Sequence, residues 1–219
     1  MRSALGLMAV MAMAAGCAAD DSQAPPSQTL PSHAVVQHAT AIGPMTVAGT
    51  TTFDIPPAAA GDFVIVAIIH DMATRPTTHA VAAGAEPLDS WLESTGDPGC
   101  NAVAELWAPF ADQPLREAES QLTVTLDGPQ VLAVDVLDVS GVAGLREANT
   151  SELSAGSGEL VVGTLTTCSA TRPALSPASR FTLVDDDRDG TSLAYAVGGS
   201  GPDWADDITG SSLATLVLR

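Results

Sequence analysis

The chain has 219 residues, of which 46% are hydrophobic and only 16% are charged, a balance typical of a folded globular protein. Its 8 basic residues are all arginines and stand against 26 acidic residues, so the formal net charge is −18. Nucleic-acid binding needs clustered positive charge, so this balance argues against a nucleic-acid partner and against unaided adhesion to an anionic membrane. The length suits one sizeable β domain.

The N-terminal segment predicts export from the cytoplasm. An apolar stretch over residues 4–15 is too short to span a bilayer stably and ends in small residues, as a cleaved export signal does. The motif Ala14-Ala15-Gly16-Cys17 resembles a bacterial lipobox, in which the thiol of the cysteine accepts an acyl chain and the cysteine becomes the first mature residue. The alternative is an ordinary secretory signal that is cleaved elsewhere, with Cys17 incidental.

The lipobox resemblance implies how the chain is held and where. Acyl chains such as palmitate on Cys17 would form the anchor, and two or three chains hold a protein far more firmly than one. By resemblance to Gram-negative lipoproteins, the lack of an aspartate directly after Cys17 implies the outer membrane. We therefore expect a signal peptide over residues 1–16, the acylated cysteine and a flexible, proline-containing tether over residues 17–32, and one folded domain over residues 33–219.

Cys100 and Cys168 are the two thiols that remain once Cys17 carries lipid. Export places them where disulfides persist, so we expect a Cys100–Cys168 bridge, which the chain-entropy estimate values at roughly 4 kcal/mol. Two separate buried thiols are the alternative. A metal site is less favoured, because no CxxC or paired histidine spacing accompanies either cysteine.

The folded part has the pattern of short strands separated by glycine, proline, aspartate and asparagine. Residues 63–70 are the most distinctive strand, because both alternating sets of side chains are apolar, as in a strand buried on both faces. A helix is the alternative, but the run is short and rich in β-branched residues. The other expected strands cover residues 34–41, 50–55, 90–94, 102–108, 121–126, 131–139, 159–168, 181–184, 191–197 and 212–218.

Turn signals join two pairs of these strands into expected hairpins. An Asp-Gly turn lies between the strands 121–126 and 131–139, and an acidic turn lies between the strands 181–184 and 191–197. Asp135 alternates with an apolar row, so we expect it at the surface. Many short strands with frequent turns predict an all-β fold, a single antiparallel β-sandwich of the jelly-roll or immunoglobulin-like type.

Four short motifs resemble those of a β-sandwich module common in bacterial surface proteins and phage tail proteins. They are Gly61-Asp62 ahead of an apolar strand, Asp89-Ser90-Trp91-Leu92, Val139-Ser140-Gly141-Val142 at the end of an apolar strand, and Gly158-Glu159-Leu160-Val161-Val162-Gly163. The similarity covers about residues 46–219. It implies a jelly-roll or lectin-like sandwich that binds a glycan or a surface.

The sequence DDDRDG at residues 185–190 is the sharpest local motif. Asp185, Asp187 and Asp189 alternate ahead of a glycine that permits a sharp turn, and Ca²⁺ prefers several carboxylate oxygens on one bent loop. The pattern resembles the front half of an EF-hand calcium loop, but Ala196 stands at the twelfth position in place of a bidentate glutamate. A further donor would have to come from elsewhere in the chain, and the alternative is a polar hairpin turn.

Trp204 is the best candidate in the sequence for an exposed, ligand-binding ring, because it lies among acidic residues in a Gly-Pro loop. A ring that seals the loop is the alternative. The four histidines lack HExxH or i,i+4 spacing, and the glycine-serine stretches 156–158 and 198–201 do not fit a GxSxG nucleophile elbow. We expect both stretches to be loops, and no cofactor other than Ca²⁺ is indicated.

Together these features predict a membrane-anchored envelope lipoprotein with a non-catalytic binding or structural β-sandwich module. Its partners would be the membrane, through the lipid anchor, and a glycan or an envelope protein. Two alternatives stay open, a hydrolase that acts on envelope glycans or esters and a calcium-stabilised adhesion domain. A hydrolase would show a deep cleft with histidine or paired acids of perturbed pKa, whereas a binding module would show a sheet face or loop end with exposed apolar groups.

Overall fold

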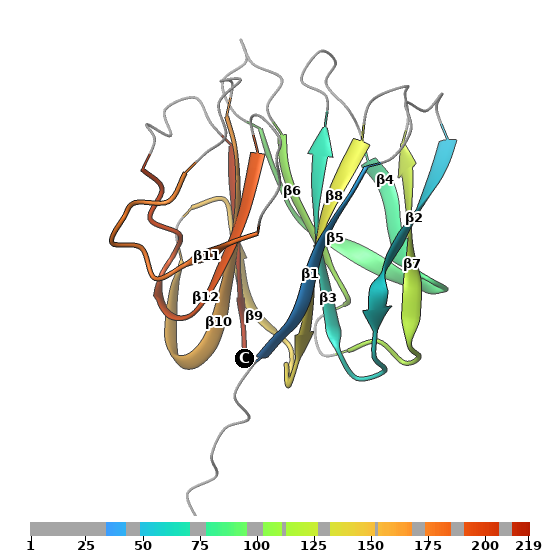
Figure 1. Ribbon diagram of the computed structural model, residues 1–219, viewed down its shortest axis with the longest axis horizontal. Helices are drawn as coiled ribbons and strands as arrows, with labels where there is room; N and C mark the ends of the chain where they lie inside the picture. Colours follow the sequence, from blue (N-terminus) through green and yellow to red (C-terminus); the bar gives the residue numbers. More distant parts are fainter. Residues whose placement is uncertain are drawn as a thin grey trace, which may run out of the picture.

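The computed structural model describes residues 34–42, 49–70, 78–95, 103–110, 113–126, 132–151, 153–167, 174–184, 191–205 and 212–219. Within these ranges the chain is all-β (Figure 1). None of the described segments forms a helix with the length and apolar character that a membrane crossing requires. The strands are β1 (Ala34–Ile42), β2 (Gly49–Ala58), β3 (Phe63–His70), β4 (Thr78–Ala83), β5 (Glu86–Thr95), β6 (Val103–Ala108), β7 (Glu119–Leu126), β8 (Leu132–Ser140), β9 (Leu145–Asn149), β10 (Ser154–Thr166), β11 (Thr182–Leu183), β12 (Thr191–Ser200) and β13 (Ser212–Leu218).

The strands form two antiparallel sheets, the smaller of which lies at the left of Figure 1. The larger sheet has eight strands in the order β1-β8-β3-β6-β5-β4-β7-β2, and the smaller has five in the order β11-β12-β10-β13-β9. The larger sheet curls until its terminal strands approach each other, and Gln37 Nε2 of β1 donates a hydrogen bond to the Pro57 carbonyl at the end of β2 over 2.7 Å. The predicted all-β sandwich is confirmed, and one of its two layers is a half-barrel.

Two apolar cores hold this architecture together. The barrel core fills the curl of the larger sheet and consists of Phe53, Ile55, Ala58, Val64, Val66, Ile68, Val81, Ala83, Leu88, Trp107, Leu115, Leu122, Val124, Leu126, Val134 and Val136. The interlayer core lies between the two sheets and consists of Phe63, Ile65, Ala67, Ala104, Leu106, Ala108, Leu137, Val139, Val142, Leu160, Val162, Val184, Leu193, Ala214, Leu216 and Leu218.

β3 contributes to both cores. Its even-numbered side chains from Val64 to Ile68 belong to the barrel core, and its odd-numbered side chains from Phe63 to Ala67 belong to the interlayer core. None of these side chains is more than 1% exposed. A strand with two apolar faces is stable where both faces are covered, which confirms the prediction for residues 63–70.

The described strands agree with the expected ones except for two that the sequence did not reveal, β4 and β9. β4 is short and alanine-rich, and β9 carries a charged pair at the edge of the smaller sheet, so neither has the β-branched alternation of a typical strand. The glycine-serine stretches 156–158 and 198–201 were expected to be loops, but the first lies within β10 and residues 198–200 of the second lie within β12. In this region the pairing of β10 with β12 shifts between Ala155 and Leu160, so the extra glycines form a bulge.

One predicted hairpin is wrong and the other is confirmed. β7 pairs with β2 and β4, whereas β8 pairs with β1 and β3, so the Asp-Gly turn does not join neighbouring strands. β8 has two buried faces and lies where the smaller sheet covers the larger one, whereas β7 buries only one of its faces fully. The burial requirement of each strand therefore outweighs the local turn signal. The pairing of β11 with β12 agrees with the second predicted hairpin.

Asp135 on β8 was expected at the surface and is 0% exposed. It lies opposite Thr40 of β1 and Ala67 of β3, on the same face of β8 as the interlayer-core residue Leu137. In a strand of alternating polar and apolar residues, the polar side chains are exposed only where the second face of the sheet is open to water. Here the smaller sheet covers that face, so the expectation is wrong.

Candidate functional site

A recess opens on the outer side of the smaller sheet, between the chain leading into β11 and the end of β12. Its volume is about 330 Å³. The segments that line it are far apart in the sequence and comprise Ala178, Ser179, Arg180, Phe181, Gly198, Gly199, Ser200, Gly201 and Asp203. Small-molecule sites usually begin at about 300 Å³, so the recess can hold a small ligand.

Charged and polar side chains stand at the mouth of the recess. Arg180 and Asp203 are both exposed, and neither side chain forms an ion pair within the described residues. Ser179 Oγ accepts a hydrogen bond from the Phe181 amide over 3.2 Å, which fixes the backbone beside Arg180. Phe181 is half-buried and packs against the apolar clusters that cover the outer face of the smaller sheet. The recess therefore offers one cation and one anion on an apolar base.

The wall contributed by β12 has no side chains at Gly198 and Gly199. Both residues have positive φ, +70° and +102°, which a residue with a Cβ rarely adopts. A Cβ built at Gly199 would meet no atom within 4 Å, so the space beside this residue is open. Backbone atoms of β12 can therefore be approached closely by a ligand.

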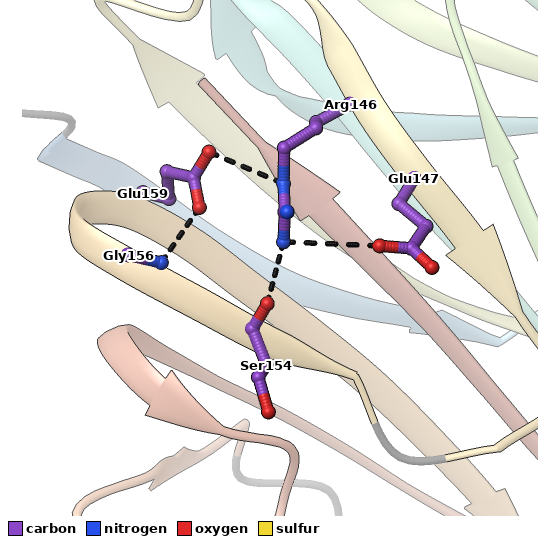
Figure 2. Close-up of polar contacts among 5 residues, drawn as sticks. All are labelled: Arg146, Glu147, Ser154, Gly156 and Glu159. Atoms are coloured by element: carbon purple, nitrogen blue, oxygen red, sulfur yellow. Dashed lines mark hydrogen bonds and ion pairs between the residues drawn. The ribbon is translucent and has the colours of Figure 1, made fainter.

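A cluster of charged residues fixes the strand that pairs with this wall (Figure 2). Ser154 and Ala155 of β10 lie opposite Ser200 and Gly199, and the bulge of β10 follows directly. Across the bulge, Glu159 Oε2 accepts a hydrogen bond from the Gly156 amide over 2.6 Å. The Glu159 carboxylate thereby closes the turn of the bulged strand.

Arg146 of the edge strand β9 completes this cluster. Its Nε lies 3.1 Å from Glu159 Oε1, and its Nη2 donates a hydrogen bond to the Ser154 carbonyl. Glu147 lies at 3.9 Å from the same guanidinium (Figure 2). Arg146 therefore joins both ends of the bulge to the edge of the sheet, and through β10 it holds the glycine wall of the recess.

Trp204 was the sequence candidate for an exposed ring, and the structure places it under the recess with 8% of its surface exposed. It belongs to a cluster with Leu165, Ala194 and Leu213, against which Leu175, Phe181 and Leu183 pack. A backbone bridge between Trp204 and Leu175 holds the loop over the sheet. Of the two interpretations of the sequence, the ring that seals the loop is the one found, because the apolar outer face of the sheet needs a cover. Its neighbour Asp203 is the residue that reaches the recess.

A second group of polar residues lies at one end of the half-barrel. Gln37 Nε2 donates to Asp138 Oδ2 over 3.0 Å, and Asp62 Oδ2 accepts from the Ala59 amide over 3.2 Å. Burial and the nearby charge of Asp62 raise the pKa of Asp138 from its ordinary 3.8 to about 6. Paired acids with a raised pKa are typical of glycoside hydrolases. Asp138 is however only 2% exposed and is enclosed by Ile55, so substrate has no access to this pair.

Several residues predicted from the sequence lie outside the described residues. These are Cys17, Cys100, Cys168, Asp185, Asp187 and Asp189. Among the residues that the structure describes, no group of three or more histidine, cysteine, aspartate or glutamate side chains is placed to hold a metal ion. The acylation, the disulfide and the calcium loop therefore stay predictions.

Sequence reasoning did not identify Arg180 or the glycine wall as parts of a site. The one available signal was the run Gly198-Gly199-Ser200-Gly201, whose glycine content indicates unusual backbone conformation or close approach. No protein-family model, no curated protein and no solved structure matches this chain.

Proposed function

We propose that this chain is an envelope lipoprotein, anchored to the outer membrane through acyl chains on Cys17, whose β-sandwich is a non-catalytic binding module. The apolar segment over residues 4–15 and the lipobox-like motif that ends at Cys17 support the anchor. The β-sandwich supports a role in which a rigid scaffold presents one binding surface.

The packing of the larger sheet is the observation that carries the binding part of the proposal. A β-barrel that encloses a ligand needs interior space that its side chains leave unfilled, whereas the side chains of the barrel core fill the curl. The half-barrel end beside Asp138 is enclosed as well. A ligand would therefore be recognised on the outside of the molecule, and the recess beside Arg180 and Asp203 combines a hollow with exposed charges.

The anchor is tested by expressing the chain with its own N-terminal segment in a Gram-negative host that is fed a fatty-acid analogue. We expect the label on the wild-type chain and none on Cys17→Ala, with the wild type in the outer-membrane fraction after density separation. Cys100→Ala is the matched control and should keep the label. Labelled Cys17→Ala protein would contradict the anchor.

The binding role is tested by cosedimentation of the purified lipoprotein with peptidoglycan sacculi and with outer-membrane fragments. We expect saturable binding without release of soluble sugar, peptide or acid from either material. Catalytic release of such products would instead support the hydrolase alternative. Absence of saturable binding to both materials would contradict the binding module.

A further inference from the structure

We propose that the recess between β11 and β12 binds a small zwitterion, an amino acid or a short peptide with both ends free, with Arg180 on its carboxylate and Asp203 on its ammonium group. This inference rests on the proposed binding function and names the ligand class of the same site. The supporting observation is the juxtaposition, around one hollow, of two opposite charges that form no ion pair among the residues the structure describes.

The charges of the recess favour a ligand that carries both signs. Arg180 is one of 8 basic residues in a chain with 26 acidic ones, so an anion without a compensating positive charge meets a repulsive overall field. Asp203 on the same recess supplies an acceptor for an ammonium group. Exposed side chains of opposite sign commonly pair with each other, and here each remains available to a ligand.

The size and the shape of the recess limit the ligand to a few atoms beyond the two charged groups. Its volume of about 330 Å³ lies at the lower end of the range for small-molecule sites. Gly198 and Gly199 leave the backbone of β12 bare, which suits the close approach of a peptide-like backbone. Phe181 supplies the apolar base on which a small side chain can lie.

Hydrogen bonds and an ion pair hold the backbone on both sides of the recess, and a preformed backbone lowers the entropic cost of binding. On one side, Ser179 Oγ fixes the Phe181 amide, and the Asp203 carbonyl accepts a hydrogen bond from the Ser176 amide over 2.8 Å. On the other side, Arg146 and Glu159 hold the strand that pairs with the glycine wall. The two charged residues therefore project from fixed backbone positions.

The experiment is calorimetric titration of the full-length lipoprotein, solubilised in a detergent without a sugar headgroup, with alanyl-alanine and three modified forms. The N-acetylated form lacks the ammonium group, the C-amidated form lacks the carboxylate, and the doubly modified form lacks both charges. We expect alanyl-alanine to bind at millimolar concentration and each single modification to weaken binding about three- to tenfold.

Two variants assign each charge to its partner. Arg180→Gln should bind alanyl-alanine about three- to tenfold more weakly and should no longer distinguish the free from the amidated form. Asp203→Asn should no longer distinguish the free from the acetylated form. Arg116→Gln and Asp54→Asn, which remove exposed charges outside the recess, should behave like the wild type.

Three results would overturn the inference. The first is that alanyl-alanine does not bind at millimolar concentration, and the second is that its free and doubly modified forms bind equally well. The third is that both recess variants still distinguish the free from the modified forms as the wild type does. Binding of the neutral trisaccharide maltotriose in place of alanyl-alanine would also overturn it. If the lipoprotein still cosediments with envelope material in any of these cases, the proposed function stands and only the zwitterion site fails.

Discussion

The larger sheet and the outer face of the smaller sheet differ in the exposure of their charged side chains. The larger sheet buries some of its acids: Asp138 lies at the end of the barrel core, and Glu105 accepts a 3.0 Å hydrogen bond from Trp107 Nε1. The outer face of the smaller sheet instead leaves Arg180 and Asp203 exposed around a recess. Both regions are built from antiparallel strands, so the difference comes from what covers each sheet. In the larger sheet the side chains of the barrel core fill the curl, whereas the loop that covers the smaller sheet leaves a recess at the surface.

A substitution in the interlayer core, which both sheets share, should give the largest change in the free energy of unfolding. Phe63→Ala removes a fully buried ring between the sheets, so we expect the free energy of unfolding to fall by about 3–5 kcal/mol in urea titrations. Phe110→Ala is the matched control, because Phe110 is 59% exposed and should change stability by well under 1 kcal/mol. Equal effects of the two substitutions would mean that the sheets do not depend on the interlayer core.

A smaller loss of stability is expected from a substitution under the loop that packs on the outer face of the smaller sheet. A Cβ at Gly163 of β10 would lie 2.5 Å from Pro202 Cγ, so Gly163→Ala should push the loop that carries Asp203 outwards and lower the free energy of unfolding by about 1–3 kcal/mol. At Gly156 the nearest atom is the end of the Glu159 side chain at 3.3 Å, which makes Gly156→Ala the matched control. Thermal melts that rank the control as the more damaging change would contradict this packing.

The buried acid Asp138 of the larger sheet predicts a pH dependence of stability. The pKa of Asp138 is raised in the folded state from 3.8 to about 6, so the folded state holds its proton more tightly than the unfolded state does. Stability from this group is then complete below about pH 4 and is lost as the pH rises through about 6. A shift of about two pKa units corresponds to at most roughly 3 kcal/mol, and solvent screening near the Asp62 turn reduces this to about 1–2 kcal/mol.

Asp138→Asn removes this titration while the amide oxygen can still accept the hydrogen bond from Gln37. The difference in unfolding free energy between the variant and the wild type should therefore be near zero at pH 4 and should reach about 1–2 kcal/mol in favour of the variant at pH 7. Asp54→Asn, which removes a carboxylate at an exposed position of the same sheet, is the matched control. A constant difference across this range would contradict the assignment to Asp138.

The smallest effect on global stability is expected at the charged cluster of Figure 2. Arg146→Gln loses a partly exposed ion pair with Glu159, so the free energy of unfolding should change by less than about 1 kcal/mol. The local effect should be larger, because the bulge of β10 loses its link to β9. Hydrogen exchange at the Gly156 amide should accelerate in Arg146→Gln and stay at the wild-type rate in Arg116→Gln. Unchanged exchange in both variants would show that the bulge holds without Arg146.

The strands were predictable where burial and side-chain pattern agree. Phe63–His70 and Ser212–Leu218 are found at their predicted bounds, since β-branched and apolar residues mark strands with buried faces. β4 and β9 were not predictable in this way, because alanine and charged residues form strands only when their neighbours supply the pairing. The local sequence therefore indicates where most strands lie, but it does not indicate which strands pair with each other.

The recess was not predictable from the sequence because its parts come from separate segments. Arg180 and Asp203 approach one hollow only after β11 and β12 have paired and the loop around Trp204 has closed on the sheet. The error at Asp135 has the same origin, since its burial depends on a second sheet whose position no local pattern encodes. A polar residue in an alternating strand can thus be buried, and an aromatic residue in a polar loop can be part of a cover.

The edges of both sheets have a consequence for molecules held close together. The terminal strands of the larger sheet face each other across the Gln37 hydrogen bond, β11 has only two residues, and β9 carries Arg146 and Glu147. Short or charged edge strands are poor templates for the addition of a strand from another molecule. Copies held close together, as the proposed acyl anchor would hold them, should therefore crowd against one another without β-aggregation or domain swapping.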